Sequence, residues 1–136
     1  MASDFNEDGG LGVELRQAAY VARLRGGPAA IDARQALRMA TMGGARCLGR
    51  EAEIGSIEPG KLADLALWDL TGIEHAGILD PVAALVFGAL PPLAALFVGG
   101  HPVVEDDLLC KAAEDDIATD LAGASTRLAR KAGLIG

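Results

Sequence analysis

The stretch from Ala36 to Leu70 constrains the fold of this chain most strongly, because it combines three local patterns in a fixed order. Its first part carries small or apolar residues at helical spacing, in the stripe Leu37, Ala40, Gly44 and Leu48. Residues 58–61, Glu-Pro-Gly-Lys, form a strong turn signal. Residues 63–70 then alternate in the manner of a half-buried strand. A helix, a turn and a strand in succession predict a mixed α/β fold.

The first part of the chain, residues 1–49, is predicted to consist of a loop followed by helices. Polar residues and a glycine pair make residues 1–10 a loop. The apolar spacing predicts a helix from Leu11 to Arg25, which the next two glycines end. Asp32 and Gln35 have the spacing of a capping box, so a second helix is expected over residues 33–42.

The second part, residues 50–136, is predicted to mix strands and helices. Asp80 followed by proline marks the start of a short helix that reaches Phe87. Two glycines between residues 93–98 and 102–105 predict a β-hairpin, and residues 108–109 add a short strand. A C-terminal helix is predicted from the apolar stripe Ile117, Leu121, Ala124 and Leu128.

Charge and hydropathy argue against several classes of protein. The net charge is −7 and the 12 Lys and Arg residues are scattered, which argues against nucleic-acid binding. No apolar run approaches the roughly 20 residues of a membrane helix. The acidic, polar N-terminus does not resemble a signal peptide, so a cytoplasmic location is expected. Cys47 and Cys110 share no motif and are predicted to be buried free thiols.

Residues with catalytic potential are few. His75 and His101 both flank turns, lack any zinc-binding spacing and are predicted to lie at the surface. The serines lie outside the sequence contexts of activated nucleophiles. Asp4 precedes a predicted helix, and its carboxylate is the candidate metal ligand of this chain, with a plain loop acid as the alternative.

Several segments resemble the C-terminal third of the metal-dependent amidohydrolase superfamily. ALRMATMGGARCLG is similar to its signature helix, and IGSIEPGKLADLALWDL is similar to the linker and strand that follow. AGILDPVAALVFGA, LFVGGHPVVEDDLL and NEDGGLGVELRQAAYVARLRGGPAA resemble the cytosine-deaminase-like branch, and within it the 8-oxoguanine deaminases. The resemblance covers about residues 6–109.

The resemblance implies a fold and a chemistry for the intact protein. The family fold is a (β/α)8 barrel with a small β-sandwich built from both chain ends, and this chain would be its C-terminal fragment. The family deaminates purine-like rings with a metal-activated water, and the metal is usually zinc. Its histidine ligands have no counterpart here. An ungapped alignment, which we prefer, places the family's last metal-binding aspartate at Met1, and a gapped one gives that role to Asp4. Leu79 stands where the family usually has histidine before the Asp-Pro pair.

Two hypotheses follow from these patterns. In the first, the chain is the C-terminal segment of a purine-base deaminase, expected to be inactive and metal-free by itself, with a small-molecule substrate only in the intact enzyme. In the second, it is a non-catalytic, self-associating structural module. Both leave apolar faces exposed, so we expect a homo-oligomer or association with an N-terminal half.

Overall fold

The N-terminal helices of the computed structural model, which describes residues 11–135, begin and end where local signals direct. Helix α1 spans Leu11–Gly26, and α2 spans Ala33–Arg38. The capping box at α2 is confirmed: Gln35 N donates to Asp32 Oδ1 at 2.7 Å, and Asp32 N donates to Gln35 Oε1 at 2.9 Å. The chain then widens into one π-helical segment, η1 (Met39–Gly43), before α3 (Gly44–Cys47). The glycine pair therefore changes the winding of the helix without ending it.

Four strands form one antiparallel sheet in the order β1-β2-β3-β4. They are β1 (Leu65–Trp68), β2 (Leu93–Val98), β3 (His101–Glu105) and β4 (Leu108–Leu109). The predicted hairpin is confirmed, because Gly99 and Gly100 connect β2 to β3 with φ of 56° and 79°. Strand β1 is shorter than predicted, and its alternation is imperfect because the pairing register with β2 shifts between Leu67 and Trp68.

Small residues allow three helices to pack closely. Helix α4 spans Pro81–Phe87, as predicted, and Asp80 caps it by accepting from Val82 N at 3.0 Å. The buried core joins α1, α2 and α4 through the residues Leu15, Ala19, Ala33, Ala36 and Val86. Alanine at the contact positions removes side-chain bulk, so helix backbones approach one another closely.

Two cation contacts support this helical core. Arg23 lies over the Phe87 ring at 4.1 Å from its centroid, and Tyr20 stacks on the same ring at 6.0 Å. Arg16 Nε donates to Val86 O at 3.0 Å. These arginines therefore link α1 to α4 while their charge remains near solvent.

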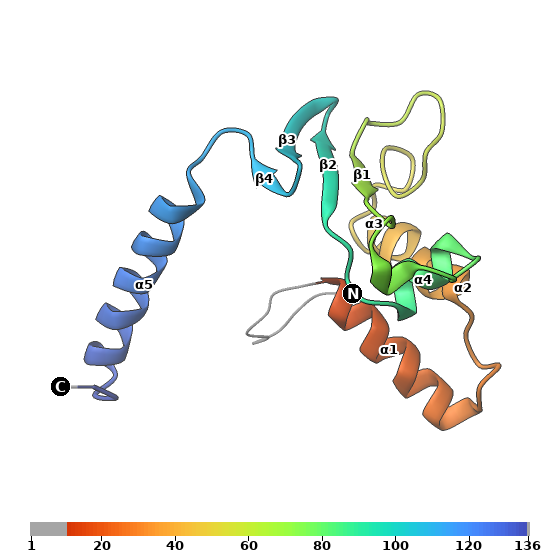
Figure 1. Cartoon of the computed structure of the whole chain (residues 1–136), viewed down its shortest axis with the longest axis horizontal. Helices are drawn as coiled ribbons and strands as arrows, with labels where there is room; N and C mark the ends of the chain where they lie inside the picture. Colours follow the sequence, from red (N-terminus) through yellow and green to blue (C-terminus); the bar gives the residue numbers. More distant parts are fainter. Residues whose placement is uncertain (1–10, 136) are drawn as a thin grey trace.

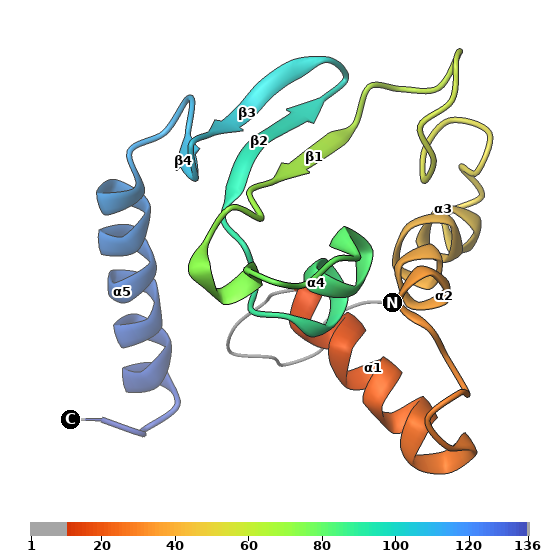
Figure 2. The same ribbon diagram turned by 45° about the vertical axis from the view of Figure 1, so that its right-hand side comes forward.

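The elements lie in three groups, which Figures 1 and 2 show from two directions. Helices α1, α2 and α4 pack on one another, and the sheet lies beside them (Figure 2). Helix α5 (Glu114–Lys131) follows β4 and stands apart from both groups in both views. The predicted division of the chain between residues 49 and 50 stays a prediction. The helical core includes α4, which belongs to the predicted second part of the chain.

Two further findings concern the surface. Cys47 and Cys110 are exposed free thiols, so the prediction that they are buried is wrong. Cys47 is the last residue of α3, and Cys110 directly follows the short outer strand β4, so neither has a packed layer above it. Within residues 11–135, no helix has the length and apolar character needed to cross a bilayer.

Candidate functional site

The first candidate, His75, is buried, so its predicted surface position is wrong. It belongs to the 3-10 turn η2 (Ile73–His75), and only 4% of the residue is exposed. His75 Nε2 lies 3.0 Å from Ala89 O, and a carbonyl can only accept, so Nε2 carries the hydrogen. Its Nδ1 has no hydrogen-bond partner and lies 3.5 Å from Glu74 Oε1. The His75 ring thus links η2 to the segment after α4 by a hydrogen bond. The residues around His75 in the sequence did not predict this structural role.

Of the other residues considered in the sequence, those that the structure describes form no metal-binding group with His75. His101 is exposed at the start of β3, beside the hairpin turn, as expected. Asp4 lies outside the described residues. Leu79, at the position where the superfamily usually has histidine, is 97% exposed. The structure therefore places the two histidines on separate elements with separate surroundings.

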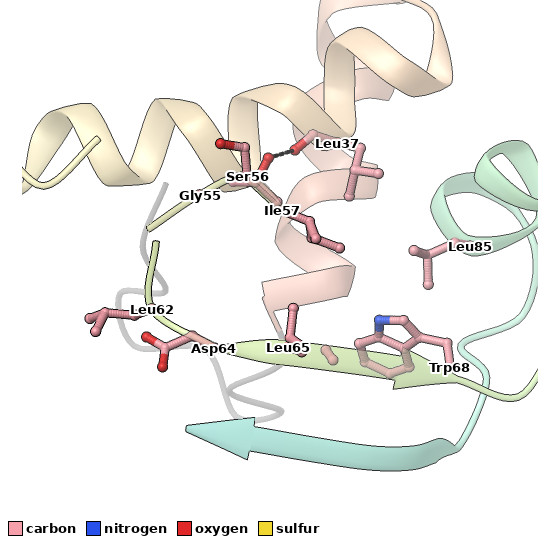
Figure 3. A pocket seen from close by; sticks show the side chains of 11 residues that line it. Leu37, Gly55, Ser56, Ile57, Leu62, Asp64, Leu65, Trp68 and Leu85 are labelled. Atoms are coloured by element: carbon pink, nitrogen blue, oxygen red, sulfur yellow. Dashed lines mark hydrogen bonds between the residues drawn. The ribbon is translucent and has the colours of Figure 1, made fainter. Parts of the chain in front are cut away.

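A hollow of about 330 Å³ lies between the helices and the first strand. Figure 3 shows Leu37 of α2, Leu85 of α4 and Trp68 of β1 around it. The loop before β1 closes another side with Gly55, Ser56, Ile57 and Leu62. The lining is mostly apolar, and residues 36–70 supply all of it except Leu85.

The polar groups at this hollow are already engaged in structural hydrogen bonds. Ser56 Oγ donates to Glu58 Oε1 at 2.6 Å and accepts from Lys61 Nζ at 2.6 Å. The Ser56 hydrogen bond, followed by the charge of Lys61, lowers the pKa of Glu58. Asp64 Oδ1 accepts from Gly99 N at 2.7 Å, which ties the start of β1 to the hairpin.

This arrangement fits an apolar side chain or segment better than it fits a reaction. The hollow contains two hydroxyls and one carboxylate: Thr41 Oγ1 donates to Leu37 O, Asp64 accepts from a backbone amide, and Ser56 lies between the ion-paired side chains of Glu58 and Lys61. The lowered pKa of Glu58 makes it a weaker base towards the Ser56 hydroxyl. The described residues therefore make this a packing surface.

A salt bridge between Arg34 and Asp80 joins α2 to α4. Arg34 Nη1 donates to Asp80 Oδ2 at 2.6 Å, and Nη2 donates to Oδ1 at 3.2 Å. This two-point hydrogen bond lowers the pKa of Asp80 against an opposing desolvation effect, and the Val82 amide lowers it further. Asp80 thus orients the Asp-Pro turn instead of acting as a free acid.

The described residues do not fit the zinc site of an amidohydrolase. Among residues 11–135, no group of three or more His, Cys, Asp or Glu side chains could hold a metal ion. His75 is committed to Ala89 O, and the carboxylates of Asp64 and Asp80 are committed to backbone or arginine donors.

Comparison with known families identifies the class of protein to which this chain belongs. The chain matches the Amidohydrolase family over residues 2–104, and it belongs to that family. Its mixed α/β fold, with an antiparallel sheet and a C-terminal helix, matches part of (β/α)8-barrel amidohydrolases.

Two relatives in sequence are deaminases. The chain is 43% identical over 95 residues to the 8-oxoguanine deaminase of Pseudomonas aeruginosa, a match covering 70% of this chain and 21% of that protein. It is 40% identical over 123 residues to the 5-methylthioadenosine/S-adenosylhomocysteine deaminase of Symbiobacterium thermophilum, covering 89% of this chain and 28% of that protein.

A solved structure gives the same result. An adenosine deaminase from Xanthomonas campestris with bound zinc superposes with a TM-score of 0.80 and 30% identity, covering 86% of this chain and 27% of that one. The matched part of this chain therefore spans only about a quarter of the length of its relatives.

Proposed function

We propose that this chain is the closing segment of a hydrolytic deaminase that acts on a purine-related base, with 8-oxoguanine as the first substrate to test. The observation that carries the proposal is the 43% identity to an 8-oxoguanine deaminase over 95 residues. The second relative is a 5-methylthioadenosine/S-adenosylhomocysteine deaminase, and both of these substrates are purine derivatives. This relative therefore supports a purine-related substrate.

In this proposal, the catalytic centre is supplied by another part of the enzyme. The described residues contain no metal group, so zinc would be held elsewhere in the intact protein. The chain by itself would be inactive and metal-free. Asp4 is the candidate ligand of this chain if the gapped alignment holds, whereas the preferred ungapped alignment gives it no such role. The enzyme is proposed to work in the cytoplasm.

We infer that the partner is the N-terminal part of such an enzyme. Strand β1 lies at the edge of the sheet, so one side of its backbone is open to a further strand. The apolar hollow beside it offers space for side chains from that segment. An exposed edge and an adjacent apolar hollow support docking of a strand-bearing segment.

Co-expression tests this function directly. The chain would be produced alone, and with the part of the Pseudomonas aeruginosa 8-oxoguanine deaminase that precedes the matched residues. We expect ammonia release from 8-oxoguanine, together with bound zinc measured by mass spectrometry, only in the co-expressed sample. 5-Methylthioadenosine serves as the competing substrate. Activity and stoichiometric zinc in the isolated chain would contradict the proposal.

A paired variant tests Asp4 separately. Asp4→Asn should abolish activity of the co-expressed sample and reduce its zinc content, because an amide is a much weaker zinc ligand than a carboxylate. Asp8→Asn removes the same charge four residues away and should leave both unchanged. Equal results for the two variants reject Asp4 as a ligand without rejecting the deaminase.

The alternative function is a non-catalytic module that associates with itself. The exposed apolar stripe of α5 favours it, since Leu121 and Leu128 are open to solvent. In that case the co-expressed sample would show no deaminase activity with either substrate, while the isolated chain would still associate.

A further inference from the structure

Helix α5 presents an apolar stripe that no other described element covers. The helix spans Glu114–Lys131, and none of its residues is buried. Ile117, Leu121 and Leu128 lie on one face and are 47%, 65% and 67% exposed. Figures 1 and 2 both show α5 separate from the helical core and extending away from the sheet. An exposed amphipathic helix of this kind is typically paired with another helix.

The spacing of the stripe is symmetric, and this symmetry identifies its partner. The apolar stripe, together with one charged residue at each end, is spaced 3, 4, 3, 4 and 3 residues apart, in the order Glu114, Ile117, Leu121, Ala124, Leu128 and Lys131. Reversing the direction of the helix gives the same spacing. In an antiparallel pair, Ile117 of one copy therefore faces Leu128 of the other, and Leu121 faces Ala124. A large residue opposite a small one allows the helices to pack closely.

The charges repeat this symmetry with opposite sign. The antiparallel arrangement places Glu114 of each copy opposite Lys131 of the other. Asp120 and Arg127 lie seven residues apart on the same flank of the stripe, so each faces its opposite in the second copy. A parallel pair would instead oppose Glu114 to Glu114 and Lys131 to Lys131. The helix dipoles also favour the antiparallel arrangement.

From this self-complementarity we propose that α5 is a dimerisation helix that binds α5 of a second copy of this chain in antiparallel orientation. The contact is isologous, with the twofold axis passing between Leu121 and Ala124. The proposal rests on the spacing and charges of α5 and not on the deaminase function.

The length of the helix sets the strength that is expected. With 18 residues, α5 is about 27 Å long and offers only two and a half repeats of the stripe. A contact of this size is small for a protein interface, so the dimer should dissociate on dilution. Sedimentation equilibrium of the full chain over a wide concentration range measures this directly.

Charge variants of the full chain test the pairing. A basic variant carries Glu114→Lys and Asp120→Lys, and an acidic variant carries Arg127→Glu and Lys131→Glu. Each alone should dimerise about tenfold more weakly or worse, because like charges then face each other. An equimolar mixture of the two should recover a heterodimer. Leu121→Asp should also abolish association, because it places a charge in the centre of the stripe.

Control variants each carry one charge reversal of the same kind on the opposite face of the helix. Asp115→Lys and Arg130→Glu should keep the parent affinity, and circular dichroism should show that α5 remains helical in every variant. The proposal is overturned if the chain is monomeric throughout, if Leu121→Asp leaves association intact, or if the charge mixture fails to recover a heterodimer.

Cross-linking tests the orientation. Because Cys47 and Cys110 are exposed, both are first changed to serine. Ile117→Cys and Leu128→Cys variants are then mixed and treated with a short bismaleimide. We expect cross-linked product in the mixture and little in either variant alone. Efficient cross-linking of Ile117→Cys with itself would show a parallel pair and reject the proposed geometry.

Discussion

At the scale of single residues, Asp80 performs two tasks with one carboxylate. It accepts two hydrogen bonds from Arg34 and one from the amide of Val82, so it joins α2 to α4 and caps α4. These contacts hold the pKa of Asp80 below its usual value. A carboxylate whose pKa is lower in the folded state stabilises that state above its unfolded pKa. The contribution is lost as the pH falls through the lowered, folded value.

A double-mutant cycle of Arg34→Gln and Asp80→Asn should therefore depend on pH in the acid range. Between pH of about 7 and about 5 the coupling between the two residues should be constant, and below about 4 it should decline towards zero. Asparagine can still cap α4, so the cycle isolates the charge. Urea denaturation at each pH supplies the four free energies of unfolding. A coupling that persists unchanged at pH of about 2 would contradict this assignment.

At the scale of elements, Gly55 allows the loop before β1 to lie against the helical segment η1 and α3. Its φ is +92°, and a Cβ atom there would lie 2.8 Å from Ala45 Cβ and 3.0 Å from Met42 Sδ. Both contacts are closer than carbon and sulfur atoms normally approach. Gly55 is therefore needed for two reasons, a backbone conformation that favours glycine and the absence of a side chain.

Gly60 separates these two reasons, because it has nearly the same φ, +91°, and nothing within 4 Å of the added Cβ. Gly60→Ala should lower the free energy of unfolding by about 1 kcal/mol through backbone strain alone. Gly55→Ala should cost about 1–3 kcal/mol more, because Ala45 and Met42 must move. Thermal and urea denaturation of both variants measures the difference. Equal effects would mean that the loop accommodates the extra methyl group.

At the scale of the whole molecule, stability rests on a small helical core, because few contacts join it to the sheet and α5 stands apart. Val86 is the largest fully buried side chain of the described residues, with 1% exposed. Val86→Ala should lower the free energy of unfolding by about 2 kcal/mol, since the cavity cannot fully close. Val21→Ala, at a position in α1 that is 48% exposed, is the matched control and should change it by less than about 0.5 kcal/mol. Urea denaturation followed by circular dichroism compares them, and equal losses would contradict this account of the core.

The sequence by itself determined the features whose physical causes lie within a few residues. The capping box of Asp32 and Gln35, the Asp80 cap and the Gly99-Gly100 hairpin were all predicted, because each involves neighbours along the chain. The helix and strand within residues 36–70 also showed the likeness to the amidohydrolases, and the family match confirms it.

Only the tertiary structure decided which side chains are covered and which surfaces remain open. His75 is buried through a contact with Ala89, 14 residues away, and the hollow needs Leu37, Trp68 and Leu85 to converge from three elements. The amphipathic pattern of α5 likewise could not predict that the whole helix is exposed. Burial depends on segments that are distant in sequence, so local patterns predict a helix and its apolar face without predicting what covers that face.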